Sequence, residues 1–201
     1  MEGANAFSQY SSILLPLLFC SIFFSFCTAA EPATDFIKAR CTVTRYRRLC
    51  IDTLSLYAEK IQQNPRVLAH TALSLTATRA RSTSALVSRL LEETRLRRRL
   101  TEAEAAAMRD CVENVGDGVD QLRRALREMG HLNGSERGLR ISNIQTWVSA
   151  ALTNYVTCMD GFQEKEIGGE LGDRVRGRID GDMRLTSNAL ALFNSFAREA
   201  P

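Results

Sequence analysis

Cysteine is the residue type of this chain best suited to covalent chemistry, because an oxidised pair forms a disulfide. Cys111 lies 18 residues before Met129, where we expect a long helix to end. Cys158 lies 18 residues after Arg140, where we expect the next helix to begin. If the chain turns back at residues 130–139, each arm is about 27 Å long and both sulfurs reach the same level. They can then form a disulfide, provided that their side chains face each other.

A second pair, Cys41 and Cys50, is close in sequence. Nine residues of continuous helix would separate the two Cα atoms by about 13.5 Å, and a disulfide tolerates roughly 7 Å. If these residues pair, the chain must bend near residues 44–48, which predicts a short helical hairpin over residues 35–63. Four cysteines allow three connectivities. Pairings that tie the hairpin to the central helices therefore stay open at this point.

The first 30 residues have the pattern of a secretory signal. Residues 13–27 form an apolar run with one proline, and small residues follow at 28–30. A membrane span needs about 20 residues, whereas a short apolar run before small residues is typical of a signal peptide. We therefore predict a signal peptide over residues 1–30 and a secreted, extracellular domain over residues 31–201. A signal anchor is the alternative.

Removal of this segment changes the cysteine count and the charge. Cys20 and Cys27 leave with it, and the four cysteines that remain in an exported chain imply two disulfides. The formal net charge rises from +3 to +4, because Glu2 is also lost. This mildly basic charge suits an acidic partner or an anionic wall polymer, and it is too small to indicate nucleic acid. We expect no membrane association of the mature chain.

No other group of side chains indicates catalysis or a cofactor. His70 and His131 have no second ligand at metal-binding spacing, so we predict no metal. Three carboxylate pairs are expected to be solvated helix surface: Glu92 with Glu93, Glu102 with Glu104, and Asp180 with Asp182. The glycine-rich segment 168–172 is expected to be a turn, because a phosphate-binding loop needs a preceding strand and a following Lys-Ser or Lys-Thr. No serine stands in a nucleophile-elbow sequence. We predict a binding protein and no enzyme.

The first two long helices have clear start signals. Asn64 and Pro65 begin a helix that runs to residue 98, because Asn is a good N-cap and Pro is favoured at the first helical position. Thr101 caps a second helix, which runs to residue 129, and Glu104 completes a capping box. Gly116 and Gly118 interrupt the second helix, and close approach of a neighbouring helix is one reason for such glycines.

Two further helices are expected over residues 140–164 and 173–198. The third helix carries a packing seam with steps of three and four residues: Ile144, Val148, Ala151, Tyr155, Cys158 and Phe162. Trp147 flanks this seam and is expected in the core. The inner residues of the last helix are predicted to be Val175, Ile179, Met183, Leu190, Phe193 and Ala197. Because no segment alternates with period two for long, the predicted fold is all-α.

Two surface features could carry modification or binding. Asn133 begins an Asn-Gly-Ser sequon in the predicted turn, which predicts N-glycosylation in a secreted chain. The basic run 95–99 reads first as a solvated helix end, where cations suit the helix dipole. Contact with pectin or with a protein partner, and proteolytic processing, are the alternatives for this run.

The motifs taken together resemble one family, the plant invertase and pectin methylesterase inhibitors. The resemblance covers residues 35–197 and rests on the order of the four cysteines and on several segments. These segments are residues 41–46 leading to Cys50, 110–114 followed by 119–122, 145–153 leading to 157–162, and 186–192. One departure is Arg47, because the family usually has a proline after the tyrosine of the first hairpin. A second departure is the basic charge, because family inhibitors are often acidic.

The resemblance implies a fold and a disulfide pattern. It implies an antiparallel four-helix bundle over residues 64–198 with an N-terminal helical hairpin. It also implies the disulfides Cys41–Cys50 and Cys111–Cys158. The inhibitor domain would then span residues 31–201.

The resemblance also implies one of two targets. Inhibitors of pectin methylesterase cover the pectin-binding cleft of the enzyme with one side of the bundle, in a 1:1 complex. Inhibitors of acid invertase use a short Pro-Lys-Phe motif after the fourth cysteine, and residues 158–182 contain no proline. We therefore predict an inhibitor of pectin methylesterase in the cell wall. The alternatives are an invertase inhibitor and a wall-binding or signalling module that inhibits nothing, with anionic pectin as a direct ligand.

The expected contact residues lie on the second and third long helices. The first three are Gln145, Ser149 and Thr153, and the next three are Asp117, Gln121 and Arg124.

Overall fold

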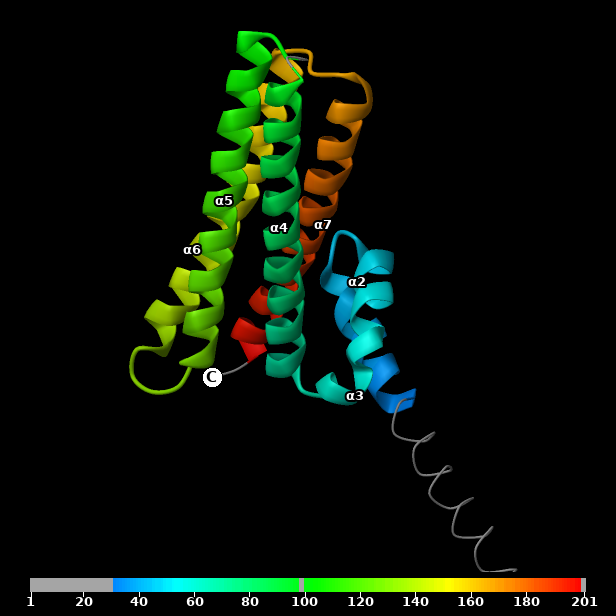
Figure 1. Cartoon of the computed structure of the whole chain (residues 1–201). Helices are drawn as coiled ribbons and strands as arrows, with labels where there is room; N and C mark the ends of the chain where they lie inside the picture. The colour runs from blue at the N-terminus through cyan, green and yellow to red at the C-terminus, as the bar shows by residue number, and fades with distance from the viewer. Residues whose placement is uncertain (1–30, 98–99, 200–201) are drawn as a thin grey trace, which may run out of the picture.

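The computed structural model describes residues 31–97 and 100–199, which form an all-helical fold. The predicted signal peptide, with Cys20 and Cys27, lies outside these residues. The four long helices lie side by side as a bundle (Figure 1). They are α4 (Pro65–Leu96), α5 (Glu102–Gly130), α6 (Arg137–Glu164) and α7 (Gly169–Glu199). The predicted antiparallel four-helix bundle is thereby confirmed.

A short N-terminal hairpin packs against α4 and α7 (Figure 1). It consists of helical residues 31–40, η1 (Cys41–Val43), α2 (Arg47–Leu54), η2 (Ser55–Tyr57) and α3 (Ala58–Ile61). The hairpin was expected to begin at residue 35, but residues 31–34 are already helical. Ala33 and Ile37 are spaced one helical turn apart and are both buried, which explains the longer arm. The bend before α2 falls where the cysteine spacing required it.

Side-chain caps fix the starts of α4 and α5 as predicted. The Asn64 Oδ1 accepts hydrogen bonds from the backbone N–H groups of Arg66 and Val67, at 3.0 and 3.1 Å. The Thr101 Oγ1 accepts from the N–H of Glu104 at 3.2 Å, and the Glu104 carboxylate accepts from the N–H of Thr101 at 2.8 Å. These bonds satisfy backbone donors that the first turn of a helix leaves unpaired.

The starts of α6 and α7 were predicted less well. The third long helix begins at Arg137, three residues earlier than expected, after a turn that Gly134 permits with φ +90°. The last helix begins at Gly169, four residues earlier than expected. Gly169 has φ +62°, so the glycine-rich segment supplies both the turn and the first turn of α7. The interpretation of all of residues 168–172 as a turn was wrong.

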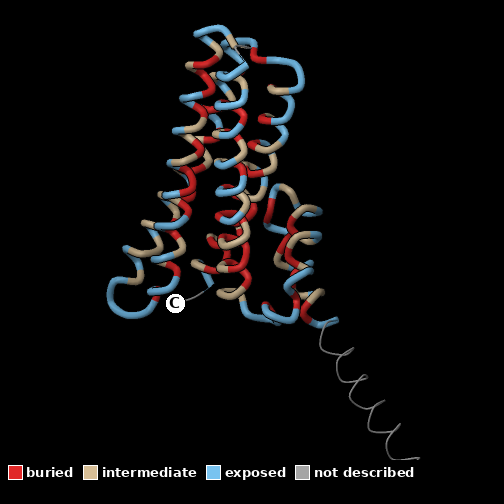
Figure 2. The backbone as a smooth tube through the Cα atoms, in the orientation of Figure 1, coloured by how far each residue is buried: buried red, intermediate tan, exposed pale blue. Residues whose placement is uncertain are grey.

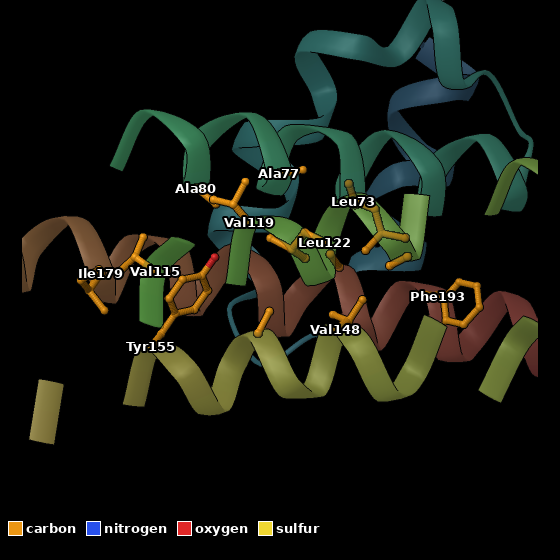
Figure 3. Close-up of a cluster of buried hydrophobic side chains, with 14 of the residues drawn as sticks. Leu73, Ala77, Ala80, Val115, Val119, Leu122, Val148, Tyr155, Ile179 and Phe193 are labelled. Atoms are coloured by element: carbon orange, nitrogen blue, oxygen red, sulfur yellow. The ribbon is translucent and has the colours of Figure 1, made fainter. Parts of the chain in front are cut away.

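The core lies along the axis of the bundle, between the four long helices (Figure 2). All six residues of the predicted α6 seam are buried. Tyr155 and Val148 project from α6 into this core, where Leu122 of α5 and Phe193 of α7 also lie (Figure 3). Trp147 is half-buried and packs against the core from its edge.

Helices α5 and α6 approach each other closely. The disulfide Cys111–Cys158 joins them with a Cα–Cα distance of 4.3 Å, and the second disulfide is Cys41–Cys50 at 5.8 Å. A β-carbon added to Gly118 would lie 3.2 Å from the Tyr155 ring. Gly118 therefore serves close packing, as predicted. Gly116 does not, because a β-carbon there would meet nothing within 4 Å.

One buried amide holds the N-terminal hairpin to α7. The Asn188 side chain, only 3% exposed, accepts a hydrogen bond from the N–H of Tyr46 at 3.1 Å. Its amide also donates to the Tyr46 carbonyl at 2.9 Å. The side chain therefore forms hydrogen bonds with both the N–H and the carbonyl of Tyr46. This pair fixes the bend of the hairpin against the bundle.

Candidate functional site

The outer surface of α6 carries no charge over most of its length. Residues 141–159 contain no Asp, Glu, Lys or Arg. The exposed residues of this stretch are Ser142, Thr146, Ser149, Thr153, Val156 and Thr157. We refer to these six residues as the α6 ridge. The neighbouring helix α5 differs, because its exposed positions are mostly arginine, aspartate and glutamate.

The α6 ridge has the composition that a protein interface needs at its centre. Burial of a charged side chain carries a desolvation cost, and interface centres are depleted of charge. Ser and Thr also lose little side-chain entropy on burial compared with Lys, Arg or Glu. The inner side of α6 is fixed by the buried seam and the disulfide, so the ridge is presented on a rigid support.

The first trio of predicted contact residues lies on α6. Ser149 and Thr153 are exposed members of the ridge, and the Thr153 hydroxyl donates to the Ser149 carbonyl at 3.3 Å. Gln145 is half-buried, and its amide donates to the Asn194 Oδ1 of α7 at 3.0 Å. Gln145 therefore lies on the side of the ridge that faces α7.

The second trio lies on α5. Asp117 and Arg124 are exposed, and Gln121 is half-buried, where it accepts a hydrogen bond from the Asn154 amide of α6 at 3.2 Å. Asn154 follows Gln145 by nine residues, and at about 100° per residue the two project from opposite sides of α6. Gln145 and Gln121 therefore lie on opposite sides of the ridge, of which Ser149 and Thr153 are members.

The sequence interpretation missed Ser142, Thr146, Val156 and Thr157 of the ridge. The signal that could have found them is the uncharged stretch itself. A helix that is uncharged on its outer face as well as its inner face departs from the usual charged surface of a soluble bundle.

The described residues contain no group of three His, Cys, Asp or Glu side chains that could hold a metal ion. His70 is half-buried, and burial, followed by the charges of Lys60 and Arg66, lowers the pKa of its imidazole. Within the same residues, no helix has the length and apolarity that a membrane span requires.

One carboxylate was assigned wrongly. Asp182 was expected on a solvated surface with Asp180, but it is fully buried and pairs with the Arg79 Nε at 2.8 Å. Two residues along a helix differ by about 200° in direction, so the neighbours face opposite environments. Burial raises the pKa of the Asp182 carboxyl, against the opposing effects of Thr83 and Arg79.

The Tyr155 hydroxyl projects into the core of the bundle (Figure 3). Burial, together with the charge of Asp182, raises the pKa of the Tyr155 hydroxyl above its ordinary value. The group is enclosed by the bundle, so it serves packing and does not form an accessible catalytic site.

The sequon Asn133 is exposed between α5 and α6, as predicted. Its Oδ1 accepts a hydrogen bond from the Arg66 guanidinium at 3.1 Å. N-glycosylation at this residue stays a prediction.

The family described as plant invertase/pectin methylesterase inhibitor matches residues 35–192. The chain belongs to this family. It is 44% identical over 172 residues to the 21 kDa protein of Daucus carota, covering 84% of this chain and 87% of the relative. It is also 44% identical over 175 residues to Pectinesterase inhibitor 11 of Arabidopsis thaliana, covering 85% of this chain and 84% of the relative.

Solved structures share the fold of this family member. A crystal structure of a mutant form of a pectin methylesterase inhibitor from Arabidopsis matches with a TM-score of 0.61 at 21% identity, over 77% of this chain and 92% of that chain. A second crystal structure, of a pectin methylesterase inhibitor from Arabidopsis thaliana, matches with a TM-score of 0.55 at 20% identity, over 79% of this chain and 93% of that chain. At these identities the likeness concerns the fold. The family is one of inhibitor proteins, in agreement with the expectation that this chain is not an enzyme.

Proposed function

We propose that this protein is a proteinaceous inhibitor of pectin methylesterase that forms a 1:1 complex and covers the pectin-binding cleft of the enzyme. Its relatives named pectinesterase inhibitors support this function. The observation in the structure that carries the proposal is the uncharged α6 ridge, which includes the predicted contact residues Ser149 and Thr153.

The mode of inhibition is steric. A disulfide and a buried seam hold α6 before binding, so the surface loses little conformational freedom when the complex forms. The ridge supplies the uncharged centre, and the charged Asp117 and Arg124 of α5 supply part of a polar rim. Such a surface blocks entry of a polysaccharide without any chemical step.

The site of action is the plant cell wall. The signal sequence predicted at residues 1–30 directs the chain to the secretory pathway. Two disulfides suit an oxidising compartment outside the cytosol.

Parallel titrations of pectin methylesterase and acid invertase test the target. The protein, secreted from a eukaryotic host, is expected to abolish the activity of at least one plant pectin methylesterase at micromolar concentration and to leave vacuolar and wall invertases active. Inhibition of invertase alone would refute the proposed target. Absence of inhibition across several methylesterases would refute the inhibitory function.

A further inference from the structure

A basic groove of about 530 Å³ lies between the bend of the N-terminal hairpin and α7. Five arginines line it, together with one aspartate, Asp180. The arginines are Arg45, Arg47, Arg48, Arg79 and Arg184. The lining includes no residue of α5 or α6, so the groove is separate from the α6 ridge.

Two glycines of α7 shape the groove. Gly177 and Gly181 lie one helical turn apart and both line it. A β-carbon at Gly181 would collide with the Arg79 guanidinium, so this glycine lets Arg79 cross α7 to reach Asp182. A β-carbon at Gly177 would meet nothing within 4 Å. The absence of a side chain there leaves the groove open.

The ion pairs around the groove leave a surplus of positive charge. Arg79 is paired with the buried Asp182, and Arg184 is paired with Asp180, each at 2.8 Å. Arg48 is 96% exposed, and its contact with Asp52 is long, at 3.7 Å.

Two further arginines add to this surplus. Arg45 and Arg47 have no acidic partner among residues 31–97 and 100–199. Arginine presents a planar fork of donors that matches a carboxylate, so such groups favour carboxylated ligands.

The groove is also held in shape before any ligand binds. Two guanidinium groups lie over the ring of Tyr46, that of Arg45 at 5.7 Å and that of Arg184 at 5.4 Å from its centroid. The backbone of Tyr46 is fixed by the two hydrogen bonds to Asn188. A preformed arrangement of this kind reduces the entropy cost of binding.

We propose that this groove binds de-esterified pectin, an oligosaccharide chain whose sugar units carry carboxylates. Five arginines that line one open groove suit a chain of repeated carboxylates better than a single small anion. Methyl-ester hydrolysis generates these carboxylates, so the ligand is the product of the enzyme that the protein is proposed to inhibit. The choice of this polymer rests on the proposed function, whereas the anion site rests on the arginines alone. Binding would hold the inhibitor on wall regions where methylesterase has already acted.

Isothermal titration of the secreted protein with an oligogalacturonate of about ten units tests the proposal. Two variants remove the site by different means. Arg45→Gln with Arg47→Gln removes the two arginines without an acidic partner. Gly177→Glu places a carboxylate in the groove without a backbone clash. The matched control is Arg89→Gln with Arg127→Gln, which removes the same charge from exposed positions of α4 and α5.

The wild type and the control are expected to bind with affinities within about twofold of each other, and both groove variants at least tenfold more weakly. The proposal would be overturned if the wild type did not bind, or if the control bound as weakly as the groove variants. It would also be overturned if either groove variant still bound like the wild type, or if the fully methyl-esterified oligomer bound equally well. Inhibition of methylesterase, measured on the same samples, is expected to be unchanged in the groove variants. A wild type that binds the oligomer but inhibits no methylesterase would refute the proposed function and leave the groove assignment standing.

Discussion

At the scale of single residues, the unexpected feature is that two neighbouring aspartates of α7 have opposite environments. Asp180 is exposed and pairs with Arg184, whereas Asp182 is fully buried and reaches Arg79 of α4. A buried ion pair is weak support for stability, because desolvation offsets much of the attraction. Its clearer effect is a dependence of stability on pH.

The Asp182→Asn variant tests this pH dependence. Burial raises the pKa of Asp182 above its value in the unfolded chain, near 3.9. The folded protein therefore binds the proton of the Asp182 carboxyl more tightly than the unfolded chain does. The stability that this protonation contributes is present below the pKa of the unfolded state and is lost as the pH rises through the pKa of the folded state. Denaturant unfolding between pH 4 and 7 is expected to show the wild type losing stability relative to Asp182→Asn as the pH rises. The exposed Asp180→Asn is the matched control, and a wild-type advantage that grows with pH would contradict this assignment.

Asn188 is a second residue whose role the structure supplies. It is buried and carries both hydrogen bonds to the backbone of Tyr46. Asn188→Ala leaves the Tyr46 N–H without this partner, whereas the Tyr46 carbonyl keeps a hydrogen bond from the Cys50 N–H at 2.9 Å. An unsatisfied buried group costs about 1–3 kcal/mol. We expect a loss of stability of about 2 kcal/mol, together with faster amide exchange in residues 41–54. Global destabilisation with unchanged exchange in the hairpin would show that Asn188 does not act as the clamp.

At the scale of the helices, the packing of α5 on α6 depends on Gly118. Gly118→Val is expected to destabilise the protein by about 1–3 kcal/mol, because the added side chain meets the Tyr155 ring. Gly116 lies two residues earlier on the same helix, and a β-carbon there would meet nothing within 4 Å. Gly116→Ala is therefore expected to stabilise the protein by up to about 1 kcal/mol, because alanine has a higher helix propensity than glycine. Chemical denaturation of the two variants measures both effects. Equal shifts in the two midpoints would mean that the close approach of α5 and α6 carries no energetic weight.

The helices differ in how well the sequence predicts their inner faces. The α6 seam is predicted completely, because apolar residues occupy every inner position at steps of three and four. The α7 prediction is only partly right, since Met183, Leu190 and Ala197 are half-buried. Its buried residues also include Asp182 and Asn188, which pair with polar groups on other elements. Apolar periodicity cannot find such residues, because their burial depends on partners that are distant in the sequence.

The same distinction holds for the candidate binding surfaces. The α6 contact residues were predicted through the resemblance of one continuous stretch, and the charge-free run 141–159 is visible in the sequence itself. The basic groove was not predicted, because it combines the hairpin bend at residues 45–48 with α7 at residues 177–184. The fold alone brings these two segments together.

At the scale of the whole molecule, the bundle presents two surfaces of different character. The α6 ridge is uncharged and is proposed to cover the enzyme. The basic groove is lined by residues of the hairpin, α4 and α7, and is proposed to bind the anionic polymer. Because the two surfaces share no residue, the protein could bind its target enzyme and the wall polymer at the same time.

A titration of pectin methylesterase with wild type and ridge variants tests whether the α6 ridge covers the enzyme. Ser149→Arg with Thr153→Arg adds two charges to the α6 ridge. Thr78→Arg with Ser82→Arg is the matched control, because it makes the same change at exposed positions four residues apart on α4. We expect residual activity to reach its minimum at one equivalent of wild type or control. The ridge variant is expected to need about a hundredfold higher concentration, which corresponds to about 2.7 kcal/mol. A ridge variant that inhibits as well as the control would show that the α6 ridge does not contact the enzyme. An end point far from one equivalent would contradict the 1:1 complex.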